Sequence, residues 1–262
     1  MDLLFYIIAG AGVGLAVGLT GVGGVSLMTP ILILYGIPEK VAIGTDLLYA
    51  ALTKFGGAWS HKKRKNIRWR VVFLLSSGSI PASLATGALL KLFFNGHLDY
   101  SHILTHSLGI MLIATGFVIF FRKKVQQERS SHPDSDYNAN SHKHTDKIIV
   151  FAGVVLGVLV TLSSVGAGAF CAALLFFLYP KMPALHVVGT DIAHAVPLTL
   201  IAGLGHFFLL DNIDFELLCG LLIGSLPAVH IGAKAGSKIP NSILQPVLAT
   251  LLIIIGCKFL FF

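Results

Sequence analysis

Two glycine clusters with neighbouring hydroxyl groups are the residues of this sequence best suited to binding a small anion. The first cluster reads GLTGVGG at 18–24 and is followed by Ser26, and the second reads SSVGAG at 163–168. Glycine is unfavourable inside a helix, so such clusters within apolar segments predict a break in the helix. The backbone N–H groups after a break are free to bind an anion, and the helix dipole favours negative charge there.

Nine residues of these clusters form the core of the predicted substrate-binding set. They are Thr20, Gly21, Gly23, Gly24 and Ser26 in the first cluster, and Ser163, Ser164, Gly166 and Gly168 in the second. The glycines would let the backbone approach a ligand, and the hydroxyls would donate hydrogen bonds to it. Alternatively, the glycines only allow close helix packing, as small residues do in membranes. Recurrence of the cluster at a corresponding place favours the anion site.

A repeated GTD motif adds two acidic residues in apolar surroundings. IGTDL at 43–47 contains Thr45 and Asp46, and VGTDI at 188–192 contains Thr190 and Asp191. We add both threonines to the predicted substrate-binding set. A charged group in the bilayer is costly and is usually functional or paired. Each aspartate could therefore carry a proton that couples transport, or could instead cap the start of its helix.

Two further ionisable residues accompany these aspartates. Lys54 follows Asp46 by eight residues and could balance the charge of a substrate anion or pair with Asp46. The alternative is that its ammonium reaches back to the membrane surface. His194 lies one turn after Asp191 and could shuttle protons or serve as a hydrogen-bonded structural histidine. The second half has Thr199 where the first has Lys54, so a cationic role is confined to the first half.

The composition requires a membrane environment for these residues. Hydrophobic residues make up 55% of the chain and charged residues 12%, and the mean hydropathy is +0.83. Soluble domains contain about 25% charged residues, which this chain cannot supply to its surface. The apolar runs are long and unbroken rather than alternating, so the predicted spans are helices and not strands.

Ten apolar segments fall into two similar halves. They lie at about 3–19, 22–36, 41–60, 71–92 and 103–121, and at about 148–164, 169–180, 186–209, 215–236 and 243–262. The GTD motifs are 145 residues apart, and GSIPA at 78–82 recurs as GSLPA at 224–228, 146 residues later. Collinear matches at a nearly constant offset indicate an internal duplication.

We therefore predict an all-α polytopic membrane protein made of two inverted-topology repeats. Each repeat comprises a short, glycine-interrupted helical hairpin and three transmembrane helices. Residues 1–121 form the first repeat, 122–147 a cytoplasmic polar linker, and 148–262 the second repeat, within one membrane domain.

The inversion follows from the distribution of positive charge. HKKRKNIRWR at 61–70 contains six cations and no acid, whereas the equivalent segment of the second half, LLDNIDFE at 209–216, is acidic. Positive loops stay on the cytoplasmic side, so 61–70 and 122–147 are predicted to be cytoplasmic. Both termini are then outside, in the plasma (inner) membrane. Inverted repeats with broken helices are typical of secondary transporters.

The ordered motifs also resemble a known family. GLTGVGGVSLMTP, GTDLLYAALTK and GSIPA in the first half, with SSVGAGAF, GTDIAHAVPLTLIAGLGH and GSLPA in the second, are similar to the sulfite exporter (TauE/SafE-like) membrane transporters. The resemblance covers nearly the whole chain apart from the central linker. It implies a helical carrier with inverted repeats that moves sulfite, sulfonates or other small sulfur-containing anions.

The expected function is therefore secondary transport of such an anion by alternating access, with proton coupling through the aspartates. An uncoupled anion channel or uniporter is the alternative. An intramembrane enzyme using the thiol of Cys171 is a third hypothesis, although the spacing places no base beside that thiol. We expect no enzymatic activity, metal site, cofactor or nucleic-acid partner. The expected partners are a small inorganic or organic anion and membrane lipid, and a homo-oligomer is compatible with the sequence.

Overall fold

The structure is a computed structural model that describes residues 2–20, 27–93, 100–127, 143–166, 168–179, 182–236 and 241–261. Ten α-helices and no strands occur within these ranges. They are α1 (Asp2–Thr20), α2 (Met28–Leu34), α3 (Glu39–Lys63), α4 (Trp69–Phe93), α5 (Ser101–Gln127), α6 (Lys143–Ser163), α7 (Ala169–Leu178), α8 (Ala184–Leu210), α9 (Phe215–Gly236) and α10 (Asn241–Phe261). Each helix falls on one of the ten predicted segments, which confirms the all-α fold.

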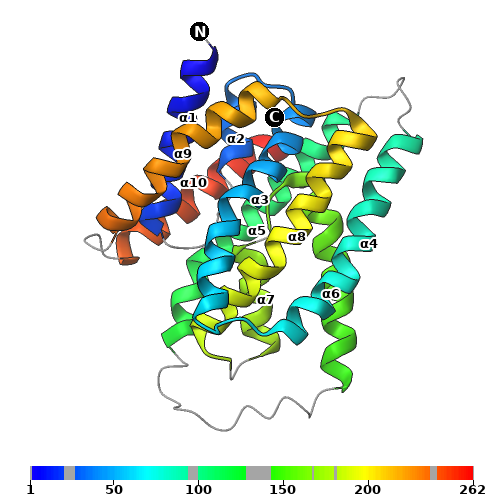
Figure 1. Cartoon of the computed structure of the whole chain (residues 1–262), viewed down its shortest axis with the longest axis vertical. Helices are drawn as coiled ribbons and strands as arrows, with labels where there is room; N and C mark the ends of the chain where they lie inside the picture. The colour runs from blue at the N-terminus through cyan, green and yellow to red at the C-terminus, as the bar shows by residue number, and fades with distance from the viewer. Residues whose placement is uncertain are drawn as a thin grey trace.

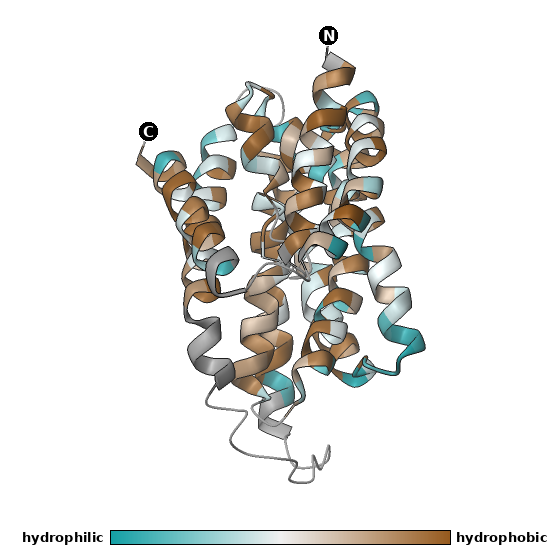
Figure 2. Ribbon diagram, turned by 90° about the vertical axis from the view of Figure 1, so that its left-hand side faces the viewer, coloured by the Kyte–Doolittle hydropathy of each residue, from teal (hydrophilic) through white to brown (hydrophobic). Residues whose placement is uncertain are grey.

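The helices have the length and surface of a membrane protein. Five of those described, α4, α5, α6, α8 and α9, are long and apolar enough to cross a bilayer. Large apolar side chains point outward along them, including Phe73 on α4 and Phe151 on α6. Figure 2 shows hydrophobic residues along most of the length of the helices. Because water would make such exposure unfavourable, the chain is an integral membrane protein.

Helices α3 and α8 form an antiparallel pair at the centre of the molecule (Figure 1). Near the start of α3, the hydroxyl of Thr45 accepts a hydrogen bond from the N–H of Asp214, which follows the end of α8, at 3.2 Å. Near the start of α8, the hydroxyl of Thr190 accepts one from the N–H of Arg68, which follows the end of α3, at 3.0 Å. The two GTD motifs therefore tie opposite ends of the pair by the same contact.

The ends of these two helices also correspond. A proline with φ near −55° precedes each helix, Pro38 before α3 and Pro183 before α8. This value of φ suits a helix start, where the missing N–H of proline costs nothing. A left-handed residue follows each helix end, Lys65 with φ 57° and Asp211 with φ 52°, 146 residues apart.

The outer helices pack against helices of the opposite half. Helix α1 packs on α9, and α4 packs on α6, one pair on each side of the central pair (Figure 1). The contacts are so close that a Cβ on one helix would overlap the backbone of the other. These pairs are Gly10 with Leu221, Gly14 with Ser225, Gly153 with Leu75, and Gly157 with Ser79. Small residues permit this approach between membrane helices.

These glycine contacts repeat at constant offsets. Gly153 and Gly157 follow Gly10 and Gly14 by 143 residues, and their partners on α4 and α9 are separated by 146 residues. The first two contacts join α1 to α9, and the other two join α6 to α4. Each half therefore supplies its first helix to the other half in the same register.

A helix break lies at the second glycine cluster, as predicted. Helix α6 ends at Ser163, and α7 begins at Ala169. Between them, Ser164 has φ 57° and Gly166 has φ 109°, values that end a right-handed helix. At the first cluster, α1 ends at Thr20 and α2 is only seven residues long, shorter than the predicted segment 22–36.

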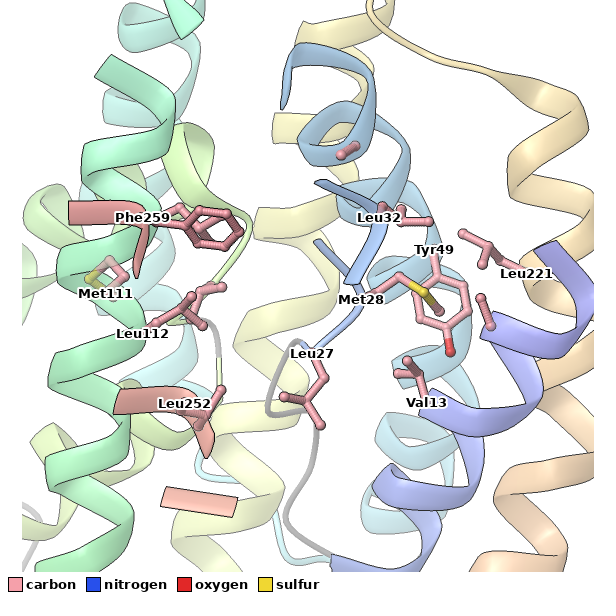
Figure 3. Packing of buried hydrophobic residues seen from close by; sticks show 14 of the residues in the cluster. Val13, Leu27, Met28, Leu32, Tyr49, Met111, Leu112, Leu221, Leu252 and Phe259 are labelled. Atoms are coloured by element: carbon pink, nitrogen blue, oxygen red, sulfur yellow. The ribbon is translucent and has the colours of Figure 1, made fainter. Parts of the chain in front are cut away.

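Apolar side chains from several helices pack around the short helix α2. Tyr49 of α3 lies among Val13, Met28 and Leu221 in one buried cluster (Figure 3). These four residues come from α3, α1, α2 and α9 respectively. The cluster therefore holds the short helix α2 between α3 and the α1–α9 pair.

One end of the molecule carries the predicted basic loop. Arg70, at the start of α4, forms an ion pair at 2.7 Å with Asp146, in the first turn of α6. Helix α5 continues to Gln127 and α6 begins at Lys143, so both helices extend into the segment predicted as a linker. The ion pair brings the loop at 61–70 to the same end as the start of α6, as expected if both lie on one side of the membrane.

Candidate functional site

The carboxylate of Asp46 links the helix that follows the first glycine cluster to the break in the second half. Asp46 lies inside α3 and is 1% exposed. Its Oδ2 accepts hydrogen bonds from the hydroxyl and the N–H of Thr29 on α2, at 2.5 and 3.3 Å. It also accepts one from the hydroxyl of Ser164, between α6 and α7, at 3.0 Å. Hydrogen bonds to an ionised acceptor are stronger than neutral ones, so this contact fixes three segments against one another.

The alternative that the aspartates cap their own helices is wrong. Helix α3 begins at Glu39 and α8 at Ala184, which places each GTD motif inside the helix rather than at its start. The helices begin earlier because Pro38 and Pro183 initiate them. Asp46 instead receives the N–H of a residue in the first turn of another helix, α2.

Asp191 lies in a different chemical environment. It is 3% exposed on α8, and it interacts electrostatically with the thiol of Cys171 on α7. The Sγ of Cys171 is also 3.8 Å from Nδ1 of His194. The other ring nitrogen of His194, Nε2, is 2.9 Å from the hydroxyl of Ser79 on α4. A connected set of buried groups thus runs from α7 through α8 to α4.

The structure places the imidazole of His194 beside the thiol of Cys171, which the spacing of the sequence did not indicate. The two residues are 23 positions apart on separate helices and meet only because α7 packs against α8. Sequence reasoning also missed Thr29 and Ser79 as polar partners of the site. Thr29 lies just beyond the glycine cluster, and Ser79 lies in the repeated GSIPA motif, which was the one signal for it.

Lys54 lies between the two aspartates. Its ammonium, partly buried on α3, interacts electrostatically with Asp191 most strongly and with Asp46 next. Lys54 is three residues past the midpoint of α3, whereas each aspartate is five or six residues before the midpoint of its own helix. With a rise of about 1.5 Å per residue and antiparallel helices, the aspartates lie about 8 Å from the middle, on opposite sides.

The aromatic neighbours of the aspartates occupy equivalent places. His194 of α8 contacts Ser79 of α4, and Tyr49 of α3 faces Ser225 of α9. Tyr49 and His194 are 145 residues apart, and the two serines are 146 apart. The second half thus has an ionisable imidazole where the first has a phenol.

Three further predicted residues, Ser163, Thr45 and Thr190, make structural hydrogen bonds. Ser163 shapes the break, because its hydroxyl donates to the carbonyl of Leu159 at 2.6 Å and accepts the N–H of Val165 at 3.2 Å. Thr45 and Thr190 each accept a hydrogen bond from the backbone of the loop that follows the neighbouring central helix. Substrate binding by these three residues stays a prediction.

The glycines of the second cluster lie at the turn itself. Gly166 has a positive φ, and its carbonyl accepts the N–H of Gly168 at 2.8 Å. Gly168 is the residue just before α7 and has an extended φ of −178°. In the first cluster, Thr20 is the last residue of α1. The predicted site residues Gly21, Gly23, Gly24 and Ser26 lie outside the described residues.

The site therefore combines two carboxylates, one ammonium, a thiol, an imidazole and several hydroxyls in the interior of a helical membrane protein. Within the described ranges, no three His, Cys, Asp or Glu side chains are arranged to hold a metal ion. Buried charge of this kind is expensive unless it is paired. Such a set can bind a charged solute or a proton, and it lies where both halves of the chain meet.

The chain is similar to proteins described as membrane transporters over almost its entire length. It is 38% identical to the probable membrane transporter protein YjnA of Bacillus subtilis over 253 residues, 96% of this chain and 97% of that protein. It is 27% identical to YdhB of the same organism over 249 residues, 95% and 96% of the two chains. A probable membrane transporter protein of Methanocaldococcus jannaschii is 28% identical over 274 residues, covering 95% and 92%.

The family comparison agrees with these relatives. No solved structure matches the chain. Residues 6–259 match the family described as sulfite exporter TauE/SafE, a range that includes both glycine clusters and both GTD motifs. This chain therefore belongs to the sulfite exporter TauE/SafE family of membrane transporters.

Proposed function

We propose that this protein is a secondary transporter that moves a small, sulfur-containing oxyanion, such as sulfite or a sulfonate, by alternating access. The family description supports this class of substrate. The observation that carries the proposal is the position of the charged site, because Lys54, Asp46 and Asp191 lie on the two central helices that join the halves. Transporters with repeated halves bind their substrates at such a place.

The paired contacts of the two halves support the alternating mechanism. Thr45 with Asp214 and Thr190 with Arg68 are equivalent contacts at opposite ends of the antiparallel pair α3 and α8. The packing of α1 on α9 and of α6 on α4 is likewise equivalent in the two halves. Two halves with equivalent contacts can exchange conformations, which would close one end of the molecule while opening the other.

We further propose an orientation in the plasma membrane in which the loop at 61–70 and the segment 122–147 are cytoplasmic. The loop is strongly basic, which favours the cytoplasmic side. The ion pair between Arg70 and Asp146 supports a common side for both segments. Both termini are then outside.

Flux measurements on purified protein in liposomes test the proposal. Radiolabelled sulfite and a small sulfonate should enter liposomes containing the protein faster than empty liposomes, and a pH gradient should drive accumulation. Gly166→Leu should abolish flux because it places a branched side chain at φ 109° in the break. Gly205→Leu is the control, because nothing lies within 4 Å of a Cβ at Gly205.

Two outcomes of the same assay would contradict the proposal. If no tested anion enters faster than into empty liposomes, anion transport by this protein is refuted. If flux ignores the pH gradient and is unchanged in both Asp46→Asn and Asp191→Asn, an uncoupled channel or uniporter replaces the coupled carrier. The thiol-enzyme hypothesis predicts that Cys171→Ser is inactive, whereas a carrier should keep flux because a serine hydroxyl can also interact with Asp191.

A further inference from the structure

We propose that the two equivalent aspartates have different tasks: Asp46 is a positioning residue that holds α2 against the second break, and Asp191 is the group that pairs with Lys54 and releases it to the substrate anion. This inference rests on the proposed transport function. It places the substrate at the junction of α3, α7 and α8 rather than at the hydrogen-bond donors around Asp46.

Asp46 is fixed by donors from both halves of the chain. Thr29 contributes its hydroxyl and N–H, and Ser164 contributes its hydroxyl, all to the same carboxylate oxygen. Thr29 and Ser164 are themselves buried. An incoming oxyanion would have to displace a carboxylate that is covalently part of the protein, and α2 and the second break would lose their common partner.

Asp191 is surrounded by groups that can be shared with a ligand. The thiol of Cys171 is a weak donor, and the ammonium of Lys54 is at the end of a flexible four-carbon chain. A substrate oxyanion presents Lys54 with the same kind of acceptor as the carboxylate of Asp191. His194 lies next to the thiol, and the hydroxyl of Ser79 contacts the opposite ring nitrogen of His194, which extends the set of polar groups from α8 to α4.

The charges of these groups predict proton coupling at Asp191. Lys54 and ionised Asp191 are together neutral, so a bound monoanion would add one uncompensated negative charge to a buried site. Uptake of one proton by Asp191 would return the site to the net charge it has without the anion. The titratable or charged groups that face Asp191 are Lys54 from α3, Cys171 from α7 and His194 from its own helix, and Asp46 acts on them through Lys54.

The asymmetry between the halves supports this assignment. Thr199 stands on α8 where Lys54 stands on α3, so among the described residues of the two central helices only the first half places a cation between the two aspartates. That cation interacts more strongly with Asp191 than with the carboxylate of its own helix. Lys54 of the first half is therefore paired with Asp191 of the second half. A substrate that takes the place of Asp191 would affect both halves, as coupled movement requires.

The test compares Asp46→Asn with Asp191→Asn in liposomes. The substrate is a small radiolabelled sulfonate, whose own charge does not change with pH, and the readout is its uptake with and without a pH gradient. We expect Asp191→Asn to lose at least tenfold of the gradient-driven accumulation while it still unfolds in one cooperative transition. We expect Asp46→Asn to keep its response to the gradient but to melt at a lower temperature.

Variants of the cation and of the Asp46 donors complete the experiment. Lys54→Met should abolish stabilisation of the purified protein by the sulfonate, whereas Lys54→Arg should retain part of it. Ser164→Ala removes a donor to Asp46 with a smaller change, so it reports on the positioning role even if Asp46→Asn fails to fold. It should keep the gradient response. The double variant Lys54→Thr with Thr199→Lys moves the cation to the equivalent place and should not restore binding.

The results separate this inference from the transport function itself. If the wild type transports but Asp46→Asn or Ser164→Ala loses the gradient response, or if Asp191→Asn keeps it, the division of tasks is overturned. Recovery of sulfonate binding by the double variant also overturns it, because the two places would then be interchangeable. If the wild type transports no anion, the proposed function fails, whatever the variants do.

Discussion

Ser164 combines a strained backbone with a contact to a buried charge. Its φ of 57° is unusual for a residue with a side chain and costs about 1–2 kcal/mol relative to a right-handed conformation. The other described non-glycine residues with positive φ, Lys65 and Asp211, follow the ends of the equivalent helices α3 and α8. Ser164 instead lies in the second break, where its hydroxyl reaches Asp46. The hydrogen bond to Asp46 thus holds Ser164 in a strained backbone conformation. Strain of this kind is typical of segments that change conformation during function.

Two substitutions at Ser164 separate these effects. Ser164→Ala and Ser164→Gly both remove the hydrogen bond to Asp46, but glycine adopts the left-handed conformation without strain. We expect Ser164→Gly to be more stable than Ser164→Ala by about 1 kcal/mol, measured by thermal unfolding in detergent. Equal stability of the two variants would show that the residue does not hold a left-handed conformation in the membrane protein.

At the scale of helices, close packing through glycine joins the two halves. Gly14 of α1 approaches Ser225 of α9 so closely that a Cβ would overlap its backbone, and Gly157 of α6 approaches Ser79 of α4 in the same way. Ser79 and Ser225 are the serines that face His194 and Tyr49. Helix packing and the polar site therefore depend on the same two interfaces.

A matched pair of substitutions on α1 tests this packing. Gly14→Leu should separate α1 from α9 and destabilise the protein by at least 2–3 kcal/mol, roughly the cost of overpacking a buried contact. Gly12→Leu, two residues away, should be tolerated because nothing lies within 4 Å of a Cβ there. Melting temperatures in the same detergent compare the two variants, and similar losses in both would argue against the α1–α9 interface.

Local sequence signals predicted the elements better than the contacts between them. Apolar length, the GSIPA and GTD repeats and the glycine clusters were sufficient to predict ten helices and the second break. They could not predict that Cys171 meets His194, because the pairing depends on how α7 packs against α8. The capping role failed for a local reason, because a proline starts each helix before the GTD motif.

Across the whole molecule, equivalent backbone positions carry opposite charges. The sequence has Lys65, Arg68 and Arg70 after α3, and it has Asp211, Asp214 and Glu216 in the same order after α8, each 146 residues later. The helices α3 and α8 are antiparallel, so these two loops lie at opposite ends of the pair. The charge difference would orient two similar halves in opposite directions during membrane insertion.

Labelling of two equivalent positions tests this orientation. Lys65→Cys and Asp211→Cys, each in a chain whose three native cysteines are replaced by serine, should react with a membrane-impermeant thiol reagent from opposite sides. Intact cells should label only the Asp211→Cys protein, and inside-out vesicles only the Lys65→Cys protein. Labelling of both positions from the same side would contradict the inverted arrangement.

The exchange of first helices between the halves has a consequence for biosynthesis. Helix α1 is made first, yet the surface it needs, on α9, is translated about 200 residues later. At a translation rate of about 5–20 residues per second, α1 waits at least ten seconds in the bilayer with Gly10 and Gly14 uncovered. Nascent chains that stop before α9 leave this surface unpaired, so quality-control proteases that recognise orphaned membrane helices should remove them. The packing of α1 on α9 therefore makes synthesis of the chain through α9 a condition for the stability of α1.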